Sequence, residues 1–188
     1  PIGGGIVKMG RNGCSYWYAL PRMRLSGTIS TATGEEGVEG MGWIDRQWGT
    51  WNWMGLCGWK WFAVHLEDGR DIAAFQIYEP VSMRPMVRIC QTVSNDGSYQ
   101  IWRDLTVHDV DAWVSPDMND RYSCRWRINS QGASLHLRVL PVLREQEVYR
   151  GLWEGSCMVE GELGGREVSG VALVELSAGR PAPMLIWY

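Results

Sequence analysis

Six tryptophans crowd a short stretch near the start of the chain and surround only three charged side chains. The tryptophans are Trp43, Trp48, Trp51, Trp53, Trp59 and Trp61, and the charged residues are Asp45, Arg46 and Lys60. A carboxylic acid among indole rings loses solvation when it ionises, so its pKa rises and it can deliver a proton at neutral pH. Indole faces also stabilise a carbocation by cation–π attraction. The stretch therefore predicts either proton-transfer chemistry on a large apolar ligand or a tryptophan-rich core with its charges turned to water.

Hydrogen-bond donors lie in and near the same stretch, on Tyr18, Arg46, Gln47 and Lys60. A shape-based catalyst needs an apolar cavity that holds its substrate in a reactive conformer, and one or two such donors to polarise an activating carbonyl. The sequence contains no Gly-x-Ser-x-Gly nucleophile motif, no phosphate-binding loop and no dinucleotide fingerprint. We therefore expect acid–base or shape-based catalysis without a cofactor, or binding of an apolar molecule without chemistry.

Cysteine and histidine spacing does not follow a metal-site pattern. The cysteines are Cys14, Cys57, Cys90, Cys124 and Cys157, and the histidines are His65, His108 and His136. An odd number of cysteines without a Cys-x-x-Cys motif argues against a zinc site and against a disulfide framework. We expect no bound metal, and we expect most cysteines to be small buried side chains.

Composition is that of a globular protein, with 45% hydrophobic and 21% charged residues in 188 and a formal net charge of −3. The absence of basic runs argues against a nucleic-acid partner. No apolar stretch approaches the roughly 20 residues that a membrane helix needs, and no secretory segment is recognisable. The sequence predicts a cytoplasmic protein that binds a hydrophobic small molecule.

The chain is predicted to be all-β, because short alternating runs are separated by turn residues at fairly regular intervals. The turn signals are Thr33-Gly34, Asp68-Gly69, Asn95-Asp96-Gly97, Gln131-Gly132 and Gly164-Gly165. The predicted strands are 22–32, 36–46, 58–66, 70–78, 84–92, 98–106, 121–129, 133–140, 151–163, 166–176 and 183–188. Segment 107–120, which is rich in aspartate, is predicted to be an irregular connection.

Two β units in tandem are expected, at residues 1–80 and 81–188. Prolines at positions 80 and 85 interrupt strand pairing and mark the boundary between them. In the second unit Leu135, Leu137 and Val139 alternate with polar residues, which predicts one buried and one exposed face. Strand 58–66 is apolar on both faces and should be buried on both sides.

Several motifs follow one another along the chain. They are Leu20-Pro21-Arg22-Met23-Arg24-Leu25-Ser26-Gly27, Gly42-Trp43-Ile44-Asp45-Arg46-Gln47-Trp48-Gly49, Gly58-Trp59-Lys60-Trp61-Phe62, Leu66-Glu67-Asp68-Gly69-Arg70, Trp113-Val114-Ser115-Pro116, Trp153-Glu154-Gly155 and Val174-Glu175-Leu176. In this order, over positions 18–176, they resemble the lipocalin-like carotenoid 1,2-hydratase family.

The resemblance implies tandem lipocalin-like antiparallel β-barrels that hold no cofactor. Hydratases of the family add water to an isoprenoid double bond, and related lipocalin-like proteins act as Diels–Alder-type cyclases on polyenes. The proton-donating aspartate of the hydratases maps to Asp45, and its aromatic neighbours map to Trp43, Trp48, Trp59 and Trp61. Glu154 and Glu175 fall in motifs of the second half, and we expect them to tie the two barrels together.

The pair Asp45-Arg46 departs from the family, because many members carry Asp-His there. An ion pair with Arg46 would hold the aspartate ionised, which is the wrong state for an acid. Neighbours in a strand point to opposite faces, however, so Arg46 can face away from it. The missing histidine favours cyclisation over hydration of a polyene, isoprenoid or polyketide intermediate. A non-catalytic carrier of a hydrophobic small molecule is the alternative.

A second departure is that only 20 residues precede Pro21-Arg22. Residues 14–78 then supply about four strands, too few to close a barrel of about eight. We therefore expect the first barrel to be incomplete, and to be completed by a separate N-terminal chain or by a second copy. The alternative is that the tryptophan-rich strands pack onto the second barrel as one larger sheet system.

Overall fold

The computed structural model describes residues 5–8, 13–51, 58–79 and 82–177, and these residues form strands joined by turns, with no α-helix among them. The chain divides into two compact units, Pro1–Trp51 and Asn52–Tyr188. The strand pairs within each unit are antiparallel. The all-β antiparallel fold class predicted from the sequence is confirmed.

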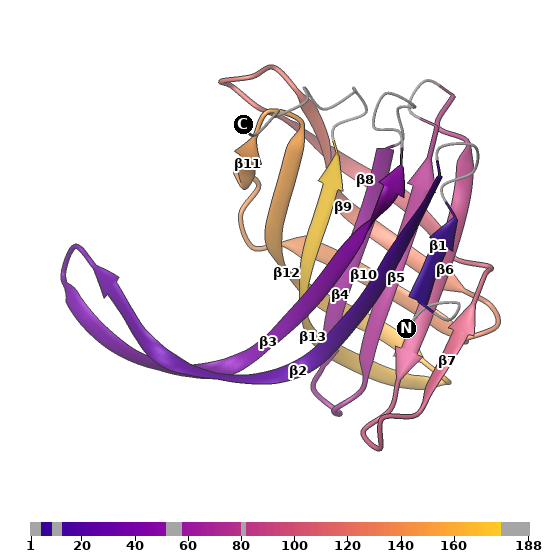
Figure 1. Cartoon of the computed structure of the whole chain (residues 1–188), viewed down its shortest axis with the longest axis horizontal. Helices are drawn as coiled ribbons and strands as arrows, with labels where there is room; N and C mark the ends of the chain where they lie inside the picture. The colour runs from indigo at the N-terminus through magenta and orange to yellow at the C-terminus, as the bar shows by residue number, and fades with distance from the viewer. Residues whose placement is uncertain (1–4, 9–12, 52–57, 80–81, 178–188) are drawn as a thin grey trace. The chain divides into compact units, whose positions relative to one another are not determined.

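The first unit is a three-stranded sheet in the order β1–β2–β3 (Figure 1). Its strands are β1 (Ile6–Lys8), β2 (Gly13–Thr31) and β3 (Gly34–Trp51). β2 and β3 form one long hairpin that Figure 1 shows as a curved ribbon. Their pairing shifts register between Leu20 and Met23, where Arg22 adopts a left-handed backbone with φ of 57°. A bulge of this kind bends and twists the strand that contains it.

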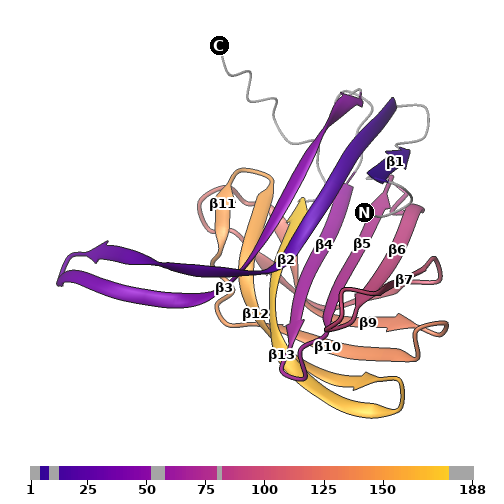
Figure 2. The same ribbon diagram turned by 60° about the horizontal axis from the view of Figure 1, so that its bottom comes forward.

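The second unit is a ten-stranded antiparallel sheet. Its strands are β4 (Gly58–Leu66), β5 (Asp71–Tyr78), β6 (Pro85–Val93), β7 (Tyr99–Trp102), β8 (Thr106–Val114), β9 (Arg121–Ser130), β10 (Leu135–Pro141), β11 (Glu147–Tyr149), β12 (Leu152–Leu163) and β13 (Arg166–Ser177). Their order is β7–β6–β5–β4–β13–β12–β10–β9–β8, and β11 pairs with β12. Figures 1 and 2 show that the sheet curls into an open barrel, which is the lipocalin-like shape.

A short connection at residues 103–105 joins β7 at one edge of this sheet to β8 at the other. Leu105 is fully buried. The Asp104 carboxylate accepts hydrogen bonds from Ser130 Oγ at 2.6 Å and from the Gly132 backbone N–H at 2.7 Å. These bonds hold the pKa of Asp104 below its ordinary value. The connection is thereby anchored to the turn between β9 and β10.

Aromatic side chains fill the inner face of the curled sheet. Trp126 of β9 meets Phe62 of β4 edge-on, with ring centroids 5.5 Å apart, and meets Trp153 of β12 at 5.8 Å. All three side chains are fully buried. The Trp126 indole N–H donates to Ser123 Oγ, and that of Trp153 donates to the Arg144 carbonyl, so both buried donors are satisfied. The core therefore joins strands from opposite sides of the barrel.

Most predicted strands are confirmed within one to three residues at each end. The alternation in β10 is confirmed as well, because Leu135, Leu137 and Val139 are buried while His136 and Arg138 are exposed. Strand β4 has no exposed residue, as its apolar sequence predicts. The hairpin strands extend well beyond the predicted 22–32 and 36–46. The predicted strand 183–188 lies outside the described residues.

The prediction that 107–120 is an irregular connection was wrong for its first half, which forms β8. Asp109 and Asp111, two of the aspartates that suggested a loop, lie on this edge strand, where charged side chains are common. The pairing of β8 with β9 shifts register on both sides of Asp111, so the strand is bulged rather than absent.

The segment that we expected to separate two β units joins β5 to β6 within one sheet. The compact units divide instead between residues 51 and 52. This division places β4 and β5 with the second unit, because β4 pairs with β13 over seven residue pairs from Gly170↔Leu66 to Leu176↔Lys60. The correspondence of the two units to two tandem barrels stays a prediction.

The described cysteines are free thiols. Cys90, Cys124 and Cys157 are buried, as expected, and Cys14 is half-buried. Burial raises the pKa of Cys90 and of Cys157 to about 12. Such thiols are unreactive at neutral pH, and the position of Cys57 lies outside the described residues.

Candidate functional site

The predicted site residues fall on both units of the chain. Tyr18 lies on β2 and Lys60 on β4, together with the tryptophans at 59 and 61. The remaining members lie on β3, and they are Trp43, Asp45, Arg46, Gln47 and Trp48. The hairpin group and the β4 group are described separately below.

On the hairpin, the Asp45 carboxylate is held by an indole. Trp17 Nε1 donates to Asp45 Oδ1 at 2.8 Å, from β2 to β3. Ala19 is the residue directly opposite Asp45, so Trp17 reaches it diagonally across the ladder. This hydrogen bond fixes the direction of the carboxylate that the family resemblance marks as the acid. The sequence prediction did not include Trp17.

The two faces of the hairpin separate the predicted residues. Residues 43, 45 and 47 alternate with 46 and 48 along β3, so Asp45 and Arg46 point to opposite faces. On the Arg46 face, the Trp48 ring stacks on Tyr16 with centroids 5.7 Å apart and meets Tyr18 edge-on at 6.1 Å. One face therefore carries the acid with Trp17, and the other carries an aromatic cluster with the guanidinium.

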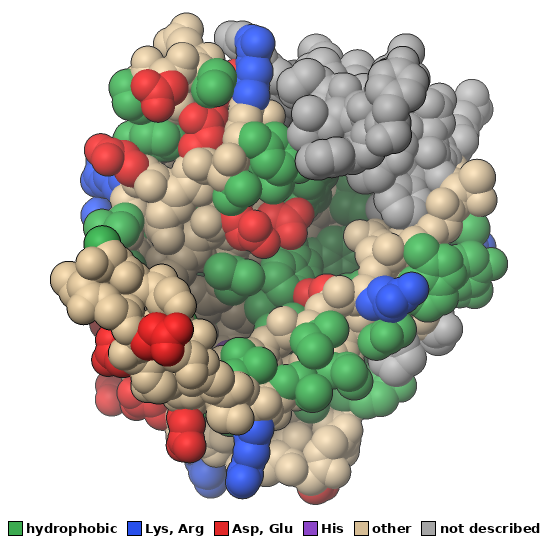
Figure 3. Space-filling model, turned by 60° about the vertical axis from the view of Figure 1, so that its left-hand side comes forward, with side chains coloured by type: hydrophobic (Ala, Val, Ile, Leu, Met, Phe, Trp, Pro, Cys, Tyr) green, Lys and Arg blue, Asp and Glu red, His purple; other side chains and the backbone are tan. Residues whose placement is uncertain are grey.

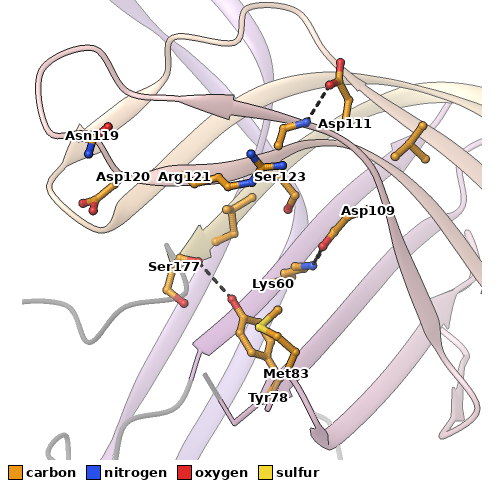
Figure 4. A pocket seen from close by; sticks show the side chains of 13 residues that line it. Lys60, Tyr78, Met83, Asp109, Asp111, Asn119, Asp120, Arg121, Ser123 and Ser177 are labelled. Atoms are coloured by element: carbon orange, nitrogen blue, oxygen red, sulfur yellow. Dashed lines mark hydrogen bonds and ion pairs between the residues drawn. The ribbon is translucent and has the colours of Figure 1, made fainter. Parts of the chain in front are cut away.

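Strand β4 separates its predicted residues in the same way. Lys60 is 4% exposed and points into the curled sheet, whereas Trp59 and Trp61 lie on the opposite face. Lys60 Nζ donates to both carboxylate oxygens of Asp109 on β8, each at 2.6 Å (Figure 4). Lys60 therefore forms an ion pair with a strand across the barrel, and its side chain does not share a face with Trp59 and Trp61.

The outer face of β4 and β13 carries a carboxyl group with unusual surroundings. Trp59 Nε1 donates to Glu175 Oε1 at 2.6 Å, and Trp61 lies directly opposite Glu175 in the ladder. Glu154 of β12 faces Glu175 on its other side. Burial and the charge of Glu154 raise the pKa of Glu175, and the hydrogen bond from Trp59 opposes them without cancelling them.

Glu175 is therefore a carboxyl group that keeps its proton to higher pH than an ordinary glutamate while it touches an indole. The sequence placed Glu175 in a family motif and assigned it a structural role only. The only signal for Glu175 in the sequence is an acidic residue within a run of alternating apolar residues. That signal does not reveal how far the folded chain buries the carboxyl group. The role of joining two barrels stays a prediction.

Among the residues that the structure describes, no group of three or more His, Cys, Asp or Glu side chains is placed to hold a metal ion. Over the same residues, no helix is long and apolar enough to cross a membrane.

Two of three comparisons with known proteins found a match, one to a family and one to solved structures. Residues 3–180 match the model of the AttH-like family. No curated protein sequence matches the chain. A solved structure of a putative AttH from Nitrosomonas europaea superposes with a TM-score of 0.80 at 22% identity, covering 93% of this chain and 55% of that one. Kievitone hydratase from Nectria haematococca superposes with a TM-score of 0.76 at 18% identity, covering 94% and 56%. The chain therefore spans little more than half the length of both proteins, and at these identities the likeness shows the fold alone.

Proposed function

The chain belongs to the AttH-like family, and on that basis we propose that it serves a hydratase-type reaction, the addition of water to a carbon–carbon double bond of a hydrophobic small molecule. The observation that carries the proposal is the Glu175 carboxyl, whose raised pKa and contact with the Trp59 indole suit a proton donor. Kievitone hydratase, which shares the fold, is by its name an enzyme of this reaction type.

The chemistry needs one acid, one cation-stabilising surface and one base. The acid transfers its proton to one carbon of the double bond, and the neighbouring carbon becomes a carbocation, which indole faces stabilise. Water adds to that carbon and loses a proton to the carboxylate that the first step left behind, so the acid is restored and the net change is one added water. A protonated carboxyl at neutral pH is the scarce component, because an ordinary glutamate is ionised there.

Asp45 is the second candidate for the acid, and it is the one that the resemblance to carotenoid 1,2-hydratases marks. Its support in the structure is the indole hydrogen bond from Trp17, which orients the carboxylate within an aromatic hairpin. Trp43 shares this face with Asp45, and we propose it as the aromatic contact for substrate if Asp45 is the acid. Trp59 and Trp61, on the face of Glu175, take that role if Glu175 is the acid.

Incubation with unsaturated isoprenoid and polyene probes in heavy-oxygen water tests the reaction type. One heavy oxygen in the product supports hydration. An unlabelled isomer of equal mass overturns hydration and identifies a cyclase, and tight binding seen by tryptophan quenching without turnover identifies a carrier.

The Glu154→Gln variant tests which carboxyl donates the proton. If Glu175 is the acid, turnover falls as pH rises through its pKa. Removing the neighbouring negative charge lowers the pKa of Glu175, so in Glu154→Gln the fall moves to lower pH while the plateau at low pH stays. If the pH dependence of turnover is the same in Glu154→Gln as in the original protein, Glu175 is not the proton donor, and Asp45 becomes the first candidate.

We also propose that further strands complete the first unit. β3 is an edge strand of a three-stranded sheet, and apolar side chains of the hairpin are exposed, among them Leu25, Ile29, Val38 and Met41. Figure 3 shows one face of the molecule, with hydrophobic side chains among those at its surface. An unpaired edge with exposed apolar residues is a site for strand addition. The solved structures, whose chains are about 1.7 times as long by the shares covered, have the chain length to supply such strands.

A further inference from the structure

A cavity of about 540 Å³ opens on the inner side of the second unit. Its wall is made by side chains of β4, β5, β8, β9 and β13 and of the turns at residues 83 and 119–120 (Figure 4). Small-molecule sites typically have volumes of about 300–1,000 Å³. The cavity lies on the face of β13 that carries Leu176, which is opposite to the face of Glu175. It is therefore a different site from the one considered for hydration.

An ion pair between Lys60 and Asp109 forms part of the cavity lining. Lys60 is buried and its ammonium is shared by both oxygens of Asp109. The same ammonium lies 5.7 Å from the ring centroid of Tyr78, whose hydroxyl donates to the Ser177 carbonyl at 3.2 Å. Figure 4 shows Lys60 and Asp109 pointing toward each other. The charge of Lys60 is neutralised, so it does not attract an anionic ligand strongly.

The rim carries an acid with spare hydrogen-bonding capacity. Asp120 lines the cavity and is 2% exposed. Its Oδ1 accepts no hydrogen bond from the part of the chain that the structure describes, and its Oδ2 is 3.9 Å from Arg150 Nε. A buried carboxylate oxygen without a donor is costly. A ligand that brings a donor to this position removes that cost on binding.

The strand that forms one wall of the cavity is irregular where it meets the cavity. The register of β8 shifts between Asp109 and Asp111 and again before Ala112. Arg144 Nη2 lies 2.8 Å from Asp111 Oδ2, and the backbone N–H of Ala112 donates a hydrogen bond to Asp111 Oδ1. Bulges re-aim side chains next to binding sites. Here the bulge leaves Val110 and Ala112 on the lining as apolar contacts.

We propose that this cavity binds a neutral small molecule with an apolar body and a hydroxyl group, the hydroxyl donating to Asp120 and the body lying against Met83, Ala112 and Leu176. Each acid on the lining lies beside a base, Asp109 beside Lys60, Asp111 beside Arg144 and Asp120 beside Arg150, so the lining favours a neutral ligand. The acids at 109 and 111 have a base at 2.6 and 2.8 Å. Asp120 has only the 3.9 Å contact of its Oδ2 with Arg150, and its Oδ1 accepts no hydrogen bond from the described residues, so Asp120 keeps acceptor capacity for the ligand.

Calorimetric titration of the protein with matched naphthalene probes tests the proposal. We expect 2-naphthol to bind at least tenfold more tightly than 2-methoxynaphthalene, because only the first can donate to Asp120. Equal affinities for the two probes overturn the proposal. Tighter binding of protonated 2-(aminomethyl)naphthalene than of 2-naphthol also overturns it, in favour of a cationic ligand.

Two variants locate the binding. Asp120→Asn keeps the shape and weakens the acceptor, so 2-naphthol should lose about tenfold in affinity while 2-methoxynaphthalene is unaffected. Ala112→Trp fills the cavity and should abolish binding of both probes. Met158→Trp should not, because Met158 is exposed on the face of β12 that points away from the core. Binding that survives Ala112→Trp places the ligand elsewhere and overturns the assignment. Turnover is not measured, so the result is separate from the fate of the proposed hydratase function.

Discussion

The hairpin of the first unit and the curled sheet of the second use strands in opposite ways. β2 and β3 are 19 and 18 residues long, yet apolar side chains such as Leu25 and Ile29 remain about half exposed. β9 has 10 residues and buries every second one. A two-stranded ribbon has no opposite wall of its own, whereas nine strands in series bend far enough to bring Phe62 against Trp126. Burial in this protein therefore follows from curvature and strand number and does not follow from strand length.

We expect the two regions to differ most in how much a single substitution in each lowers the free energy of unfolding. We predict that Trp126→Ala lowers the free energy of unfolding by about 3–5 kcal/mol, because it empties a fully buried position between two aromatic rings. Urea denaturation followed by circular dichroism measures the change. Ile29→Ala on the hairpin is the matched control, and a loss there as large as that of Trp126→Ala would contradict the contrast drawn above.

The next prediction compares the two acids, one on each region. We expect Glu175→Gln to reduce turnover by about 10²-fold or more, the range for loss of a general acid. Asp45→Asn makes the same change on the hairpin, and Glu162→Gln is an exposed control on β12. Initial rates with the labelled-water assay decide. Unchanged turnover in Glu175→Gln together with reduced turnover in Asp45→Asn would identify Asp45, on the hairpin, as the proton donor.

These two regions also show what the sequence could predict. Strand positions in the curled sheet followed from local alternation and turn residues, and the opposite orientations of Asp45 and Arg46 followed from the strand period alone. The ion pair of Lys60 with Asp109 joins residues 49 positions apart on opposite walls, and no local pattern encodes it. The same holds for Glu175, whose indole partner Trp59 is 116 positions away in the sequence.

A third prediction concerns pH and stability. Burial raises the pKa of Glu175 in the folded protein, so the folded state holds this proton more tightly than the unfolded chain. Its contribution is fully present below the unfolded pKa of about 4.3 and is lost as pH rises through the folded value. Glu175→Gln still accepts from Trp59 and does not ionise. Its Tm should therefore exceed that of the original protein at pH 7, and the two should converge below pH 4.

Thermal melts across this pH range test the sign. Glu162→Gln, which changes an exposed glutamate on the same sheet, should show no growing difference with pH. A Tm for Glu175→Gln that falls below the original at pH 7 would mean that the carboxylate is stabilised by its surroundings when ionised.

The smallest expected effect lies at the hairpin end. We predict that Val38→Thr, on an exposed position of β3, changes stability by no more than about 0.5 kcal/mol in the isolated chain. If further strands cover this hairpin, the same substitution should weaken their association measurably. Light scattering of the 188-residue chain provides the reference state, and a compact monomer of 21.3 kDa with no tendency to associate would count against such strands.

The pairing of β13 with β4 has a consequence for how the protein is made. Gly170 meets Leu66 across this seam, so the barrel wall is joined by residues more than 100 positions apart. During synthesis β4 leaves the ribosome long before β13 exists, and the edge of β4 that pairs with β13 stays open until β13 arrives. Contacts of such long range slow folding and prolong the exposure of unpaired edges. The second unit therefore completes its fold only after translation of β13, and truncations that remove this strand should yield an aggregating chain and not a smaller barrel.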